Sequence, residues 1–304
     1  MMKFISNKLS SLKKKTAVLQ EALNHYLSVN ASTLAVSLAY YTLFSLTPLL
    51  IIAVVIVGFV YGKDVAEGHI IGQLSEYIGP RTARFLQQLI LRSFNPASGV
   101  IAACLSGAFL IYGASTIFYQ LRFSLDIIWN VRQKNKLSAG KWIKMRALPF
   151  LLVIMSGVVL LASMIVSTLI QILTLKIDNM LHGSLIILQT VSFFINLGIT
   201  TVIFALLYKY VSNAVVAWKV VWVGALFTAS LLSLLKFFLV FYFSHTALIS
   251  IYGAAASLVI LLLWLNYTSQ VVFLGAEFIR MYSIQIKCPI VPSKYASYRY
   301  YSGS

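Results

Sequence analysis

Long apolar stretches separated by short polar segments run through most of this chain. Six of them lie at about residues 31–60, 99–121, 147–175, 184–208, 220–243 and 254–276. Each is long enough for a helix to cross a bilayer, which takes about 20 residues. The pattern therefore predicts an all-α integral membrane protein, a bundle of six transmembrane helices. Composition agrees, since 60% of the 304 residues are hydrophobic and 10% are charged, more apolar than a soluble core requires.

Three segments outside the spans have patterns of their own. Residues 1–30 carry apolar side chains at helical spacing among lysines, which predicts a cytosolic amphipathic segment on the membrane surface; the alternative is a loosely ordered tail. Two short amphipathic runs, separated by Gly79 and Pro80, predict interfacial helices or a cap on the bundle. Residues 281–304 read as an irregular cytosolic tail, so 31–280 form the membrane domain.

The basic residues predict the orientation of the bundle. With six spans, 18 of the 24 lysines and arginines fall on the side that holds both termini. Because cytoplasmic segments carry the excess of Lys and Arg, both termini are expected to be cytosolic. The net charge of +17 is then explained by topology, and no nucleic-acid partner is invoked.

The sixth span carries a stripe of small and polar residues on one helical face. At about 100° per residue this face contains Tyr252, Ala255, Asn266, Gln270 and Glu277. Such a stripe is expected to face other helices or water rather than lipid. Two interpretations stay open: the stripe packs helices together, or it forms one wall of a substrate path.

The first two spans have related features. Tyr41 and Ser45 share a face of the first span with Pro48, where a kink is predicted because proline removes a backbone hydrogen bond. Tyr41 and Ser45 are the candidates for the opposite wall of the path. In the second span, Ser106 and Gly113 belong to a seam of small residues, which predicts close helix packing.

Two charged residues lie in or near spans. Lys236 falls inside the fifth span, where an ionisable residue is a functional candidate; the alternative is that it snorkels to the outer interface. Glu277, near the cytosolic end of the sixth span, has Arg280 three residues on as a local partner. The two are predicted to be too far apart in depth to pair with each other.

Three stretches resemble a known family. They read LAYYTLFSLTPLL (38–50), YGASTIFYQLRFSLDIIWNV (112–131) and YGAAASLVILLLWLNYTSQVVFLGAE (252–277). In order and spacing they are similar to the YihY/BrkB family of bacterial inner-membrane proteins, also labelled "ribonuclease BN". The resemblance implies six membrane helices in the inner membrane. One departure is Asp126, where the family is expected to have Asn.

Three functions follow from these patterns. The first is transport, export or lipid translocation, with a lipid or small molecule as substrate. The second is a non-transporting envelope or scaffold protein, for which a homo-oligomer is compatible. The third, RNA cleavage, is disfavoured because the seven acids and four histidines are scattered and form no metal-ligand or paired-carboxylate motif. The chain is therefore expected not to be an enzyme and to need no cofactor or metal.

Overall fold

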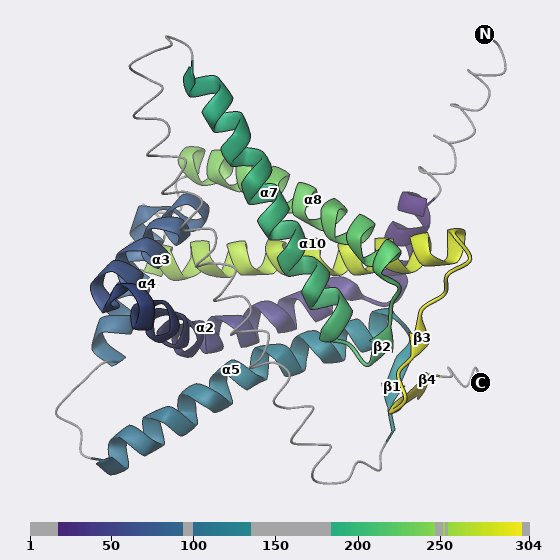
Figure 1. Cartoon of the computed structure of the whole chain (residues 1–304), viewed down its shortest axis with the longest axis horizontal. Helices are drawn as coiled ribbons and strands as arrows, with labels where there is room; N and C mark the ends of the chain where they lie inside the picture. The colour runs from purple at the N-terminus through teal and green to yellow at the C-terminus, as the bar shows by residue number, and fades with distance from the viewer. Residues whose placement is uncertain (1–17, 94–99, 135–183, 247–251, 253–254, 300–304) are drawn as a thin grey trace.

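The computed structural model describes residues 18–93, 100–134, 184–246, 252 and 255–299. Helices dominate this part of the chain (Figure 1). The elements are α2 (Ala31–Tyr61), α3 (Lys63–Ile78), α4 (Pro80–Ser93), α5 (Val100–Ile128), β1 (Val131–Gln133), α7 (Ser184–Tyr210), β2 (Ala214–Val215), α8 (Trp218–His245), α10 (Ala256–Gln285), β3 (Val291–Pro292) and β4 (Ala296–Tyr298). A further helical segment, Val18–Ser28, precedes α2.

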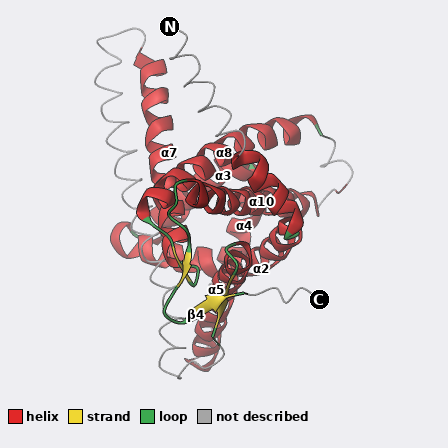
Figure 2. Cartoon of the chain, turned by 90° about the vertical axis from the view of Figure 1, so that its right-hand side faces the viewer, coloured by secondary structure: helices red, strands yellow, loops and turns green. Residues whose placement is uncertain are grey.

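Helix α10 is the central element. It packs against α2 and α8, while α5 packs on α2 and α7 on α8. Helices α3 and α4 gather at one end of the bundle, and the four strands lie at the other (Figure 1). The view in Figure 2 looks onto the strand end. That end, with its two short β-ribbons, is called the ribbon end below.

Apolar side chains form two separate clusters along the bundle. One lies toward the ribbon end and includes Leu125, Tyr208, Phe273 and Ile279. The other lies toward α3 and α4, and includes Val54, Leu86, Leu261 and Trp264. Each cluster draws on α2, α8 and α10, so burial of apolar surface holds these helices together at two levels.

Two glycines allow α8 and α10 to approach closely near the ribbon end. A Cβ at Gly224 would lie 2.6 Å from Ile279 Cδ1 and nearer still to Cγ1. A Cβ at Gly275 would lie 2.6 Å from the Tyr208 hydroxyl and nearer still to Thr228 Oγ1. The sequence seam at Ser106 and Gly113 did not predict this contact, which is made by other small residues on other helices.

Three of the described helices are long and apolar enough to cross a membrane: Thr190–Tyr210, Trp218–Phe243 and Ala256–Gln285. A fourth candidate is the pair Val18–Ser28 and Ala31–Thr47, bent by 70°, where Asn30 adopts a left-handed backbone with φ 51°. The span predicted at 147–175 lies outside the described residues. The count of six therefore stays a prediction.

The connector after α2 folds as the two predicted helices. Gly79, with φ 80°, separates α3 from α4, and Pro80 begins α4. Ile70, Ile78 and Leu86 are buried in the apolar cluster at that end, so the two helices cover the end of the bundle. Their placement in a membrane interface stays a prediction.

The C-terminal segment differs from the irregular tail that the sequence predicted. Helix α10 continues to Gln285, and two short strands follow. Strand β3 pairs antiparallel with β2, and β4 pairs antiparallel with β1. Strands of two or three residues are too short to show an alternating pattern, and their partners lie far away in the sequence.

Candidate functional site

The two predicted walls of a path occupy the same level of the bundle. On α10, Trp264 belongs to the apolar cluster near α3 and α4, and Val272 to the cluster near the ribbon end. Asn266 and Gln270 lie between them. On α2, Ser45 lies between Leu38 of the ribbon-end cluster and Leu50 of the other. Direct pairing of the two stripes stays a prediction.

Polar groups at this level are incompletely paired. Asn266 Oδ1 and Thr268 Oγ1 are buried and have no hydrogen-bond partner among the described residues. Ser45 is buried, and its hydroxyl donates within its own helix to the carbonyl of Tyr41 at 2.8 Å. An unpaired buried polar group costs about 1–3 kcal/mol, so Asn266 and Thr268 mark a place where water or a ligand group would be stabilised.

The remaining predicted residues are more dispersed. Tyr41 and Tyr252 are 39% and 47% exposed. Ala255 is the N-cap of α10 and is exposed, and Gly113 is half-buried in α5. The side chains of Pro48 and Ser106 lie outside the described residues. Helix α2 is continuous through position 48, so the kink predicted there stays a prediction.

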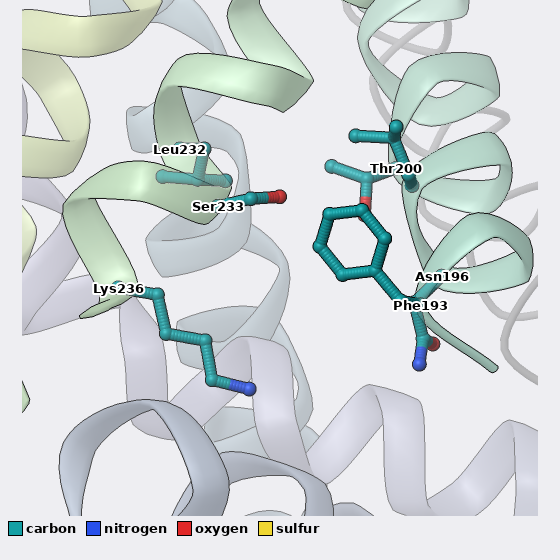
Figure 3. A pocket seen from close by; sticks show the side chains of 7 residues that line it. Phe193, Asn196, Thr200, Leu232, Ser233 and Lys236 are labelled. Atoms are coloured by element: carbon teal, nitrogen blue, oxygen red, sulfur yellow. The ribbon is translucent and has the colours of Figure 1, made fainter. Parts of the chain in front are cut away.

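Lys236 lines a pocket of about 140 Å³ between α7 and α8 (Figure 3). Three further polar side chains line it: Asn196 and Thr200 from α7, and Ser233 from α8. Phe193 and Leu232 supply apolar surface. Lys236 lies 18 residues after Trp218, the first residue of α8, or about 27 Å along the helix. The pocket therefore combines a cation with hydroxyl and amide groups far along a helix that is apolar enough to span a membrane.

Sequence reasoning identified Lys236 but missed its neighbours across the pocket. Asn196 and Thr200 are four residues apart in an apolar span, and Ser233 precedes Lys236 by three. These spacings place each pair on one helical face. That pattern was present in the sequence, but it did not show that the two faces meet.

Glu277 has a hydrogen-bond partner that the sequence did not predict. It is fully buried, and His25 Nδ1 lies 2.9 and 2.8 Å from its carboxylate oxygens. Arg280 Nη1 lies 2.7 Å from His25 Nε2 and also donates to the Ile128 carbonyl at 2.6 Å. Because arginine only donates, His25 Nε2 must accept, and its Nδ1–H donates to Glu277. His25 thus bridges Arg280 and Glu277 and ties the Val18–Ser28 segment to α10.

Two further buried hydrogen bonds fix the same part of α10. Trp129 Nε1 donates to the carbonyl of Ala276 at 3.0 Å. The Tyr208 hydroxyl donates to the carbonyl of Val272 at 2.7 Å and lies 3.0 Å from Thr228 Oγ1. These bonds satisfy polar groups that would otherwise be costly to bury. They tie the residue after α5, and helix α7, to α10, and they tie α7 to α8.

Asp126 anchors the loop after α7. Its Oδ1 accepts from the Ser212 hydroxyl at 2.8 Å and the Asn213 backbone N–H at 2.9 Å, and its Oδ2 accepts from Asn213 Nδ2 at 2.6 Å. One turn earlier, Arg122 Nε donates to the Val211 carbonyl at 2.8 Å. Asp126 lies beyond the apolar span of α5. Burial raises its pKa above the ordinary aspartate value, while the bonds from Asn213 and Ser212 and the charge of Arg122 oppose that rise.

The long apolar helices define the class of this chain as a helical membrane protein. The sequence model described as "Virulence factor BrkB" matches residues 22–292, and the chain belongs to that family. This confirms the resemblance that the three motifs indicated. No solved structure matches the chain.

Its curated relatives are named only as membrane proteins. A UPF0761 membrane protein of Pseudoalteromonas translucida is 29% identical over 261 residues, which covers 85% of this chain and 82% of the relative. One from Ralstonia nicotianae is 27% identical over 278 residues, covering 88% of this chain but 58% of the relative. One from Verminephrobacter eiseniae is 44% identical over 73 residues, 24% of this chain and 18% of the relative. The match to the Ralstonia protein thus spans little more than half of that protein's length.

Proposed function

We propose that this chain moves an anionic solute or lipid across the membrane. The observation that carries the proposal is the pocket between α7 and α8, where Lys236 shares a cavity with Asn196, Thr200 and Ser233 (Figure 3). A lysine within a membrane span is costly and marks a substrate or ion pathway by default. Its positive charge favours a substrate that bears a negative group, and no catalytic reaction is assigned to the chain.

Two buried polar groups of α10 without hydrogen-bond partners among the described residues support the same proposal. A closed, purely structural bundle would have to offset the cost of the unpaired Asn266 oxygen and Thr268 hydroxyl. In a transport path the same groups are satisfied by water or by passing polar groups of the substrate. Asn266, Gln270, Tyr252, Tyr41 and Ser45 remain the proposed path residues.

The orientation belongs to the proposal as well. The ribbon end carries many of the basic side chains of the described residues, among them Arg132, Lys209, Lys219, Lys287 and Arg299. Because cytoplasmic segments of membrane proteins carry an excess of Lys and Arg, we propose that the ribbon end faces the cytosol. Both termini are then cytosolic, and the chain lies in the inner membrane of a bacterium. Alkaline-phosphatase activity from a fusion at either terminus would contradict this orientation.

The test is reconstitution of the purified chain into liposomes, followed by lipid-scrambling and anionic-solute efflux assays. Lys236→Gln should reduce the transport rate at least about tenfold, because the charge that attracts the substrate is lost. Lys219→Gln is the matched control, since it removes the same charge from an exposed position at the start of the same helix. The control should transport like wild type.

Two results count against transport. If both variants behave alike, the pocket charge has no specific role. If well-folded wild-type protein moves neither lipid nor solute, the alternative of an envelope or scaffold protein is favoured.

A further inference from the structure

A second pocket lies at the ribbon end, away from the Lys236 pocket. It has a volume of about 450 Å³ and lies between one face of α5 and the ribbon formed by β1 and β4. Three arginines line it: Arg122 from α5, Arg132 from β1, and Arg299, which directly follows β4. These arginines are separated by up to 177 positions in the sequence, so the tertiary fold alone brings them together.

The strand register explains how two of the arginines meet. Val131 pairs with Tyr298, and Arg132 pairs with Ser297. The Arg299 backbone N–H donates to the Asn130 carbonyl at 2.9 Å, which extends the ladder by one residue. Arg299 follows Ser297 by two residues, so the two side chains are on the same face of the ribbon as Arg132, the partner of Ser297. Arg132 and Arg299 are thus diagonal neighbours on one face of the ribbon.

The other wall of the pocket holds Arg122 in place. Its Nε donates to the Val211 carbonyl, which fixes the guanidinium beside the pocket. Asp126 also lines the pocket, but its two oxygens accept three hydrogen bonds from Ser212 and Asn213. The charged side chains that line the pocket are thus three arginines and one aspartate, so the lining has an excess of positive charge.

Aromatic residues of the kind that mark a membrane interface lie in and near this pocket. Tyr119 and Phe123 line it and are 70% and 46% exposed. At the nearby ends of α7 and α8, Tyr210 packs edge-on against Trp218, and the Lys209 ammonium lies 5.4 Å from the centre of the Trp218 ring. Belts of Tyr and Trp with neighbouring lysines mark the boundary between hydrocarbon and headgroups.

We propose that the Arg122–Arg132–Arg299 pocket binds a phosphate group at the headgroup level of the membrane. Planar guanidinium groups match phosphate oxygens through paired N–H donors, and the adjacent exposed aromatic surface suits the start of an acyl chain. The phosphate comes either from an anionic phospholipid or from free phosphate. The proposal concerns a different site from the Lys236 pocket and does not depend on transport.

The experiment compares two double variants of the full chain in detergent at fixed ionic strength. Arg132→Gln with Arg299→Gln removes two charges from the pocket. Lys134→Gln with Lys294→Gln also removes two positive charges, from exposed positions directly after β1 and between β3 and β4. Binding is measured by thermophoresis with three probes: dioctanoyl-phosphatidylglycerol, dioctanoylglycerol and inorganic phosphate. Arg299→Lys, which keeps the charge but not the planar fork, serves if the first double variant does not fold.

The arginine variant should bind phosphatidylglycerol at least about tenfold more weakly than wild type, since each lost charged hydrogen bond costs about that factor. The lysine variant should stay within about threefold, and dioctanoylglycerol should not distinguish the two. Tighter binding of phosphatidylglycerol than of inorganic phosphate identifies a lipid headgroup, and equal binding identifies free phosphate. Equal weakening in both double variants, or no binding of either phosphate probe to wild type, overturns the proposal.

Discussion

Replacing Gly275 with alanine tests how closely α8 and α10 approach each other. Among the described glycines, an added Cβ would lie nearest to a neighbouring atom at this position. The new methyl group would lie 2.6 Å from the Tyr208 hydroxyl and closer still to Thr228 Oγ1. Neither neighbour moves without loss, because Tyr208 donates to the Val272 carbonyl and Thr228 donates to the Gly224 carbonyl at 2.9 Å. Helices α8 and α10 must separate, or these bonds must break.

The change in the free energy of unfolding has three contributions. Overpacking a tight contact lowers it by about 1–3 kcal/mol, and a weakened buried hydrogen bond lowers it by about 1 kcal/mol more. The higher helix propensity of alanine raises it by about 1 kcal/mol. We therefore expect Gly275→Ala to lower the free energy of unfolding by about 2 kcal/mol, or the melting temperature by about 3 °C for a chain of this size.

The assay is thermal melting of the detergent-solubilised protein followed by tryptophan fluorescence. Gly198→Ala is the matched control, because a Cβ at this exposed α7 position meets nothing within 4 Å; it should melt at or above the wild-type temperature. Thr228→Ala combined with Gly275→Ala should recover part of the loss, because the closest clashing atom is removed. If Gly275→Ala melts like Gly198→Ala, the close approach of α8 and α10 is wrong.

Three further predictions concern other polar residues. Asp126→Asn should change the free energy of unfolding by no more than about 1 kcal/mol, since asparagine keeps one acceptor oxygen. Asp126→Ala leaves three donors without an acceptor and should lower the free energy of unfolding by at least about 2 kcal/mol. Equal denaturation midpoints of the two variants would contradict this. His25→Ala should destabilise by about 3 kcal/mol by leaving buried Glu277 without its donor, and Glu277→Gln in the same chain should recover part of that loss in melting experiments. If the polar stripe of α10 lines a path, Gln270→Leu should melt like wild type but lose transport. If the stripe only packs helices together, the variant should lose about 0.6 kcal/mol of stability and keep its transport activity.

The long helices were predictable because their signal is strong. A span of more than 20 apolar residues leaves few alternatives, and the predicted span at 31–60 corresponds to α2 at Ala31–Tyr61. The break at Gly79 and Pro80 was equally clear, because glycine permits the left-handed backbone and proline cannot continue a helix interior. Local chemistry decided both features.

Features that depend on distant partners were not predictable. Glu277 was expected to have Arg280 as a local partner, three residues on, but its hydrogen-bond donor His25, 252 residues away, was not predicted. The ribbon of β1 and β4 joins segments about 165 residues apart through three residue pairs. No sequence period marks such a ribbon, so the pocket that it forms with α5 could not be foreseen.

The motifs that identify the family contain the proposed path residues of α2 and α10 and also residues that hold the bundle together. Gly275 and Glu277, at the end of the third motif, pack α10 against α8 and bind His25. Asp126 and Trp129, in the second motif, hold the loop after α7 and the backbone of α10. These roles explain why such residue types are needed to build the ribbon end of the bundle. The polar residues around Lys236 lie outside all three motifs. The proposed substrate contacts are therefore of two kinds: path residues within the family motifs, and a pocket between α7 and α8 that the motifs do not include.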